Sequence, residues 1–237
     1  MDTEQTARQR LPGAFSLFRP SYEAVLTNAW TFLALLLVPL GTLMVAGLSG
    51  NGSNQNLGFS GLALLLVLVG SVFALLVAPA LPFVQLKSVQ GKEVAIGEAF
   101  QAGMQRFWRF YGLSILVTLL TIGGLLLLIV PGLIIMRRYF LAQFYLYDRD
   151  VGILEAMRLC AADSKPFSGA IWGVIGVTVL ISVFGIYPLL GLVAAALQVL
   201  YFCAPAIRYF QIKDVIQSTD RAAKKVATKK PKRAKKS

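Results

Sequence analysis

The stretch that decides the fold runs from Ile129 to Phe167 and reads IVPGLIIMRRYFLAQFYLYDRDVGILEAMRLCAADSKPF. An apolar run is interrupted at Pro131-Gly132, resumes, and ends at two consecutive arginines, Arg137 and Arg138. A charged corner, Asp148 to Asp150, then leads into a segment with apolar residues at helical spacing. The rest of the chain repeats this order of elements, which predicts an all-α integral membrane protein.

The composition agrees with a membrane protein. Only 14% of the 237 residues are charged, whereas soluble domains average about a quarter, and the mean hydropathy is +0.68. Lys and Arg number 23 against 11 Asp and Glu, for a net charge of +12. This excess of positive charge predicts an anionic partner, either a membrane surface or a nucleic acid.

The sequence contains few of the residue types that usually carry out catalysis or bind metal ions. Histidine, the commonest general base and metal ligand, is absent. Cys160 and Cys203 are the two cysteines, too few for a four-cysteine metal site. We therefore expect a non-enzymatic protein without a metal ion or cofactor.

Six apolar runs are long enough, or nearly so, to cross a bilayer core of about 30 Å. They cover residues 29–48, 61–86, two halves of 110–147, 168–184 and 189–210. These runs pair into three predicted hairpins within a membrane domain of residues 21–212. The turn of the middle hairpin lies either at Gly123-Gly124 or at Pro131-Gly132, and the sequence does not choose between them.

The charges are distributed unequally between the loops. Loops after the first, third and fifth runs carry no charge, whereas the segments after the second and fourth, 87–109 and 151–167, are charged and amphipathic. Since Lys and Arg of short loops stay in the cytoplasm, we predict a protein of the inner (cytoplasmic) membrane with both termini cytoplasmic. Residues 1–20 then form a cytoplasmic segment, and the two amphipathic segments lie as helices along the membrane surface.

Arg137 and Arg138 are the sharpest candidates for a site. An arginine within a span costs about 2.5 to 3.5 kcal/mol, and each leucine returns only about 0.3 to 0.6 kcal/mol. The pair therefore needs a counter-charge, for which Asp148 and Asp150 are possible partners and a lipid phosphate is another. The tripeptide Arg-Tyr-Phe occurs at Arg138 and again at Arg208. We therefore group Arg208 with Arg137 and Arg138 as a predicted binding site for anionic headgroups. Structural anchoring and an ion or proton route are the alternatives.

Two further features have more than one interpretation. Gly169, Gly173 and Gly176 favour close helix packing, within the monomer or in a dimer. Residues 213–237 are polar and like-charged, which predicts a disordered tail. Its basic cluster comprises Lys224, Lys225, Lys229, Lys230, Lys232, Arg233, Lys235 and Lys236. The tail either enforces topology only or contacts anionic lipid, an acidic protein or nucleic acid.

The run from residue 125 to Gly169 resembles a group of uncharacterised bacterial membrane proteins that includes the membrane domain preceding some glycerophosphodiester phosphodiesterases. The residues that carry the resemblance are Pro131, Gly132, Arg137 or Arg138, Asp150, Gly152, Glu155, Ala156, Lys165 and Phe167. In that group the phosphodiesterase activity belongs to a separate soluble domain, which this sequence lacks. The resemblance thus implies a membrane fold and no enzyme.

These observations lead to one leading hypothesis and two alternatives. The leading hypothesis is a non-enzymatic membrane protein with an organising or anionic-lipid-interacting role at the cytoplasmic leaflet. A small-solute or lipid transporter is the alternative, and it requires a water-accessible cavity lined by Arg137 or Arg138. A membrane-bound enzyme would require a carboxylate cluster, for which the candidates are Asp148, Asp150, Glu155 and Asp163.

Overall fold

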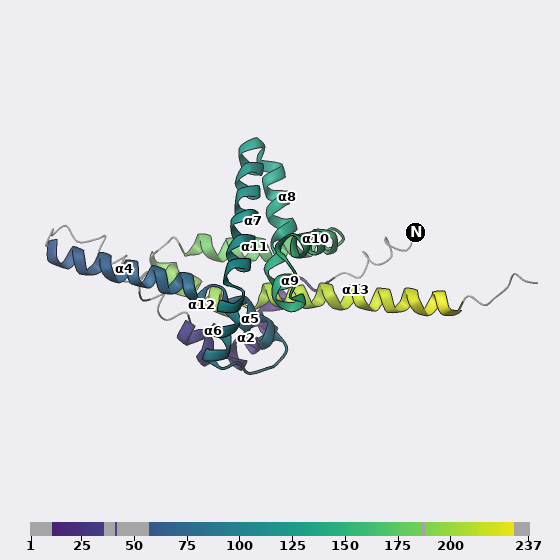
Figure 1. Cartoon of the computed structure of the whole chain (residues 1–237), viewed down its shortest axis with the longest axis horizontal. Helices are drawn as coiled ribbons and strands as arrows, with labels where there is room; N and C mark the ends of the chain where they lie inside the picture. The colour runs from purple at the N-terminus through teal and green to yellow at the C-terminus, as the bar shows by residue number, and fades with distance from the viewer. Residues whose placement is uncertain (1–10, 36–40, 42–56, 186–187, 230–237) are drawn as a thin grey trace, which may run out of the picture.

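In the computed structural model (Figure 1), the described residues are 11–35, 41, 57–185 and 188–229, and every regular element among them is a helix. The all-α prediction is confirmed for this part of the chain. Residues 29–35 are helical. The other elements are η1 (Phe15–Leu17), α2 (Phe18–Thr27), α4 (Leu57–Val77), α5 (Ala80–Val89), α6 (Ile96–Gln105), α7 (Phe107–Leu127), α8 (Ile129–Tyr139), α9 (Ala142–Arg149), α10 (Ile153–Asp163), α11 (Ser168–Phe184), α12 (Pro188–Leu200) and α13 (Ala204–Lys229).

Several of these helices are long and apolar enough to cross a membrane. Two qualify alone, Phe107–Leu127 and Val193–Arg221. Two bent pairs qualify when each is taken together: α4 from Leu64 with α5, bent by 49°, and α10 with α11, bent by 108°. Two to four candidate spans support a membrane protein. The first expected run, 29–48, lies mostly outside the described residues, and six spans in three hairpins stay a prediction.

The middle hairpin turns at a residue that neither sequence alternative named. α7 ends at Leu127, Leu128 is extended (φ −165°, ψ 140°), and α8 begins at Ile129. Figure 1 shows α7 and α8 side by side, projecting from the rest of the molecule. At about 1.5 Å per residue, the 11 residues of α8 cover only about half of a bilayer core. The expected fourth span is therefore broken, because α8 ends at Tyr139 and the chain bends before α9.

The centre of the main hydrophobic core is α9. Five of its eight residues are buried, Ala142 and the run from Phe144 to Tyr147. Four consecutive buried residues, Phe144 to Tyr147, cover every side of one helical turn, as is typical of a helix in a protein interior. Around it pack Leu113 of α7, Met157 of α10 and Tyr209 of α13. The charged corner at the end of α9, Asp148 to Asp150, is therefore held against several helices at once.

Each amphipathic segment contains a helix, α6 within 87–109 and α10 within 151–167. Their position along the membrane surface stays a prediction. In α10 the buried face consists of small or flexible residues, including Ala156, Met157 and Cys160. In α6 the buried residues are Ala99, Ala102 and Gly103. A methyl group added to Gly103 would lie 2.8 Å from the backbone nitrogen of Ala80, so α6 packs closely on α5. The larger apolar residues of α6, Ile96, Phe100 and Met104, are exposed.

The prediction of a disordered tail beginning at residue 213 is wrong for residues 213–229, which continue α13 as helix. The first half of α13 is anchored by burial of Tyr209 and Ile212, and helix propagates from an existing turn at little cost. Lys224, Lys225 and Lys229 belong to this helix. The remaining basic residues of the cluster, from Lys230 onward, lie outside the described residues.

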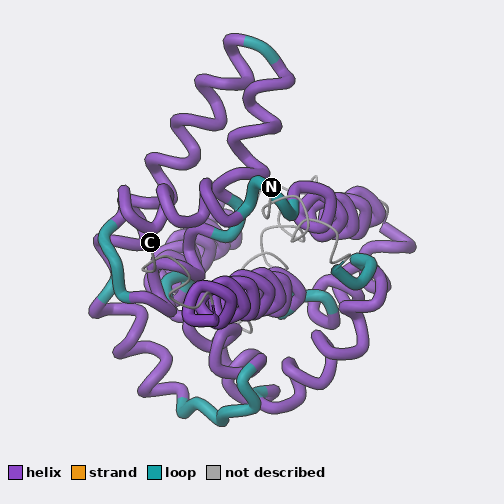
Figure 2. Tube along the Cα trace, turned by 90° about the vertical axis from the view of Figure 1, so that its right-hand side faces the viewer, coloured by secondary structure: helices purple, strands orange, loops and turns teal. Residues whose placement is uncertain are grey.

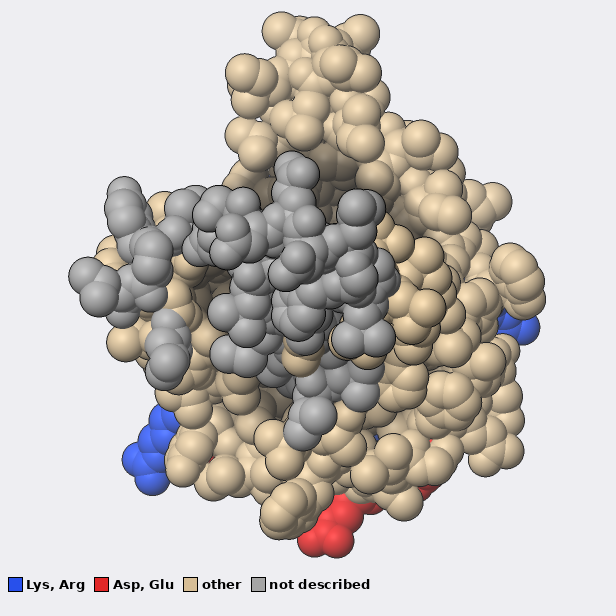
Figure 3. Space-filling model, turned by 90° about the vertical axis from the view of Figure 1, so that its left-hand side faces the viewer, with Lys and Arg blue, Asp and Glu red and all other residues tan. Residues whose placement is uncertain are grey.

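Figure 3 shows one face of the molecule on which charged side chains appear only near the lower and right-hand edges. The projecting hairpin seen at the top of this view has no charged residue from Phe110 to Met136. At its tip, Leu126 to Val130 are 66–83% exposed. Figure 2 shows the same hairpin standing clear of the other helices. This surface is suited to contact with lipid rather than with water.

Candidate functional site

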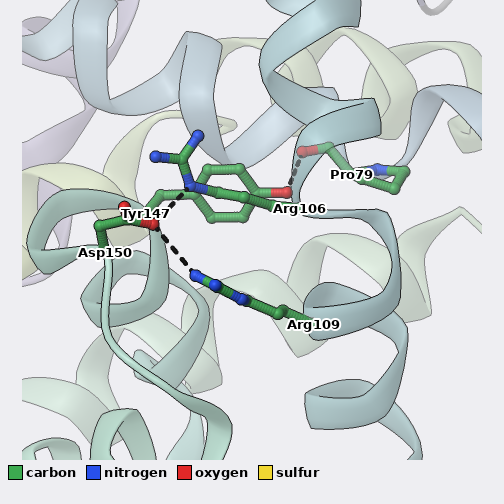
Figure 4. A network of polar contacts seen from close by, with 5 residues as sticks. All are labelled: Pro79, Arg106, Arg109, Tyr147 and Asp150. Carbon is green, nitrogen blue, oxygen red and sulfur yellow. Dashed lines mark hydrogen bonds and ion pairs between the residues drawn. The ribbon is translucent and has the colours of Figure 1, made fainter.

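The corner after α9 is held by ion pairs that the sequence analysis did not predict. Asp150 has a left-handed backbone (φ 49°), which ends α9 and turns its carboxylate toward α7. Its Oδ1 accepts from Arg106 Nε at 3.2 Å and from Arg109 Nη1 at 3.3 Å (Figure 4). The Arg106 guanidinium also lies 5.7 Å from the Tyr147 ring centroid. The corner is therefore joined to the start of α7.

Tyr147 links α9 to the break between α4 and α5. Its hydroxyl donates to the carbonyl oxygen of Pro79 at 2.5 Å (Figure 4). Burial raises the pKa of Tyr147 above its usual value, so the hydroxyl stays a donor. Proline breaks the helical hydrogen-bond ladder at this point. Tyr147 thus attaches α9 to the bend between α4 and α5.

Asp148 is paired with α13. Its Oδ2 accepts from the Tyr209 hydroxyl at 2.5 Å and from Lys213 Nζ at 2.6 Å. Tyr209 and Lys213 are four residues apart, on one face of the helix. This spacing was a signal that the sequence analysis could have used. It identifies two side chains of α13 able to approach the same carboxylate.

Asp163 is the third of the four candidate carboxylates to have a partner. Its Oδ2 accepts from the Tyr145 hydroxyl at 2.8 Å and lies 4.0 Å from Arg149 Nη2. Burial, followed by the charge of Asp163, raises the pKa of Tyr145. Asp148, Asp150 and Asp163 thus each face a different set of partners, while Glu155 is exposed. The described residues contain no group of three or more His, Cys, Asp or Glu placed to hold a metal ion.

Arg137 and Arg138 lie in the last turn of α8 and are half-buried. Asp148 and Asp150 are not their partners, because both carboxylates are bound to other residues. Within the described part of the chain, neither arginine forms an ion pair, and the Nε of each is buried without a hydrogen-bond partner. The backbone carbonyl of Arg138 accepts from Cys160 Sγ and Ser164 Oγ of α10. Packing therefore fixes the backbone of the pair and leaves its charge without a counter-ion among the described residues.

Arg208 is the third arginine of the predicted headgroup site, and it has a cavity of its own. Its side chain is buried, and a cavity of about 390 Å³ adjoins it. The cavity walls come from the segment 11–14, the entry to α11 and Arg208. Neither Arg137 nor Arg138 lines it. The three arginines do not form a single site on these walls.

The three glycines of α11 have different surroundings. A methyl group on Gly173 would lie 3.1 Å from Ala14 Cβ, so this glycine contacts the N-terminal segment rather than another long helix. Methyl groups on Gly169 and Gly176 would meet nothing within 4 Å. Within the described chain only Gly173 is therefore closely packed, and the dimer alternative stays a prediction. Gly169 instead lines the cavity beside Arg208.

Comparisons with family models, curated proteins and solved structures give no match to this chain. The resemblance to the membrane domain of glycerophosphodiester phosphodiesterases stays a prediction on the residues that carry it.

Proposed function

We propose that this chain is a non-enzymatic integral membrane protein that binds anionic lipid at the cytoplasmic leaflet. The observation that carries the proposal is the arginine pair of α8. The carboxylates nearest in sequence, Asp148 and Asp150, are bound to Lys213, Arg106 and Arg109. A guanidinium near an apolar layer needs a counter-charge, and a lipid phosphate matches its planar donor geometry.

The surroundings of the pair support a position at the edge of the apolar layer. No charged residue occurs between Phe110 and Met136, and the charged corner lies beyond α8. Arginine side chains at such a boundary extend toward the headgroups while their methylene groups stay in the apolar region. The positive-inside distribution of the loops assigns this boundary to the cytoplasmic side in our proposal.

The transporter alternative gains no support from the cavities of the described residues. Four of them have volumes of about 390, 320, 350 and 270 Å³. Neither Arg137 nor Arg138 lines any of these four. An organising or lipid-binding role therefore remains our proposal.

Native mass spectrometry of the full chain, extracted with its own lipids, tests this function. We expect bound anionic phospholipid on the wild type and less of it on the double variant Arg137→Leu with Arg138→Leu. The matched control is Arg158→Leu with Arg221→Leu, which removes the same charge from exposed positions. An equal lipid content in all three proteins would overturn the proposal.

A further inference from the structure

Arg208 carries a buried positive charge without a protein counter-ion in the described chain. Its side chain is 1% exposed. Nη1 donates to Gln211 Oε1 at 2.9 Å and Nη2 to the carbonyl oxygen of Pro12 at 3.0 Å, while Nε has no partner. No carboxylate of the described residues forms an ion pair with it. A buried charge is costly unless an opposite charge accompanies it, so the arrangement is suited to an anionic ligand.

The cavity beside Arg208 is large enough for such a ligand. Its volume of about 390 Å³ lies within the range of roughly 300 to 1,000 Å³ for small-molecule sites. The lining residues are Leu11, Pro12, Gly13, Ala14, Pro166, Phe167, Gly169, Ala170, Gly173 and Arg208. None of them is acidic. The cavity therefore offers one positive side chain and no competing negative one.

The N-terminus of α11 supplies a second attraction for an anion. The helix begins at Ser168, and no side chain caps it at Phe167. Gly169 and Ala170, both in the first turn, line the cavity. The first N–H groups of a helix have no intrahelical acceptor and carry its positive dipole end. Such a terminus binds phosphate groups, and here it lies on the same cavity as Arg208.

Gly169 gives the ligand access to this terminus. A methyl group at Gly169 would meet no atom within 4 Å, so the residue borders open space. The next turn is different, because Gly173 contacts Ala14 and so closes the cavity wall. A larger side chain at Gly169 would project into the space that a ligand needs. Gly176, farther along α11, also borders open space but does not line the cavity, so it provides a matched control.

We propose that this cavity binds the phosphate group of an anionic phospholipid, held by the Arg208 guanidinium and the first-turn amides of α11. The proposal rests on the function proposed above for the source of the phosphate and adds a site separate from Arg137 and Arg138. In the proposed topology its three walls, the N-terminal segment, the start of α11 and Arg208, all belong to the cytoplasmic side. Free inorganic phosphate offers the same chemistry and is tested separately.

The test measures binding of phosphatidylglycerol, with phosphatidylcholine as reference, to the full chain in detergent by native mass spectrometry. We expect Gly169→Leu to weaken phosphatidylglycerol binding roughly tenfold, the loss expected when about 1.4 kcal/mol of contact is removed. Gly169→Ala should have a smaller effect, and Gly176→Leu none. Arg208→Lys, which keeps the charge and loses the planar fork, should also weaken binding. Circular dichroism checks that each variant keeps its helix content.

The outcomes separate the two proposals. If Gly169→Leu and Arg208→Lys bind phosphatidylglycerol as the wild type does, the cavity proposal is overturned. If only the double variant of Arg137 and Arg138 then loses lipid, the proposed function remains supported. If the wild type prefers no anionic lipid, both fail. A titration with inorganic phosphate gives the remaining result: binding that depends on Gly169 and Arg208, without lipid binding, would overturn a lipid as the source and retain the phosphate chemistry.

Discussion

Gly124 and Gly132 meet across the α7–α8 hairpin, where a methyl group added to Gly124 would lie 2.9 Å from the Cα of Gly132. Each glycine had been a candidate for the turn itself. The structure places the turn between them at Leu128, which leaves the glycines at the contact of the two helices. Small residues allow such a close approach of helix backbones.

Replacing Gly132 with alanine should destabilise the hairpin. The new methyl group would lie 2.6 Å from the backbone nitrogen of Leu125, which cannot move without shifting α7. Overpacking of this kind costs about 1 to 3 kcal/mol, measurable as a lower thermal unfolding midpoint in detergent. Gly123→Ala is the control, because its methyl group would meet nothing within 4 Å. Equal midpoints for the two variants would contradict this prediction.

Asp148→Asn should destabilise the attachment of α13 to α9. The carboxylate accepts from Tyr209 and Lys213, and its side chain is only 12% exposed. Hydrogen bonds to a charged group contribute about 1.5 to 3 kcal/mol each. Asparagine keeps one acceptor oxygen, so we expect a loss equivalent to about one of the two bonds. The measurement is the free energy of unfolding, with Lys213→Met and the double variant completing a cycle.

The control for Asp148 is the ion pair of Arg19 with Glu23, whose side chains are 90% and 63% exposed. Solvent screens such pairs, so Glu23→Gln should leave the unfolding midpoint unchanged. Strictly additive effects of Asp148→Asn and Lys213→Met would show that the two side chains do not stabilise each other.

Two substitutions of Asp150 should distinguish the contribution of its backbone conformation to stability from the contribution of its charge. Its carboxylate is exposed to solvent, with 63% of the side chain accessible, and ion pairs that solvent screens contribute about 0 to 1 kcal/mol. Asp150→Asn keeps a residue that tolerates the left-handed backbone and should therefore cost little. Asp150→Ala should cost about 1 to 2 kcal/mol more in the free energy of unfolding. Alanine as stable as asparagine would rule out a role for the backbone conformation.

Ionisation of the buried Tyr145 hydroxyl should lower the free energy of unfolding at alkaline pH. Burial and Asp163 raise its pKa in the folded chain, whereas an unfolded tyrosine ionises near pH 10, at about its model value. The stabilisation is therefore complete below about pH 10 and is lost as the pH rises above it. The difference in unfolding midpoint between the wild type and Tyr145→Phe, measured from pH 7 to 11, should stay constant up to about pH 10 and begin to shrink above it. A constant difference across this range would contradict the prediction.

Local features of the sequence were enough to predict an all-α chain with candidate membrane spans, of which the described residues contain two to four. The apolar runs and the low share of charged residues indicated candidate spans, and apolar spacing in 87–109 and 151–167 indicated α6 and α10. The local pattern failed at residue 213. Like charge predicted disorder there, but α13 is anchored by the packing of Tyr209 and Ile212 and continues through Lys229.

The sequence by itself determined an all-helical, membrane-type chain, because helical periodicity and apolar run length are properties of neighbouring residues. Only the tertiary structure decided the partners of its charges. Asp148 pairs with Lys213, 65 residues away, and Asp150 with Arg106, 44 residues away. Such pairings depend on which helices pack around α9, and no local pattern encodes that choice. The same packing leaves Arg208 buried beside the uncapped start of α11, on a cavity that is lined by three segments far apart in the chain.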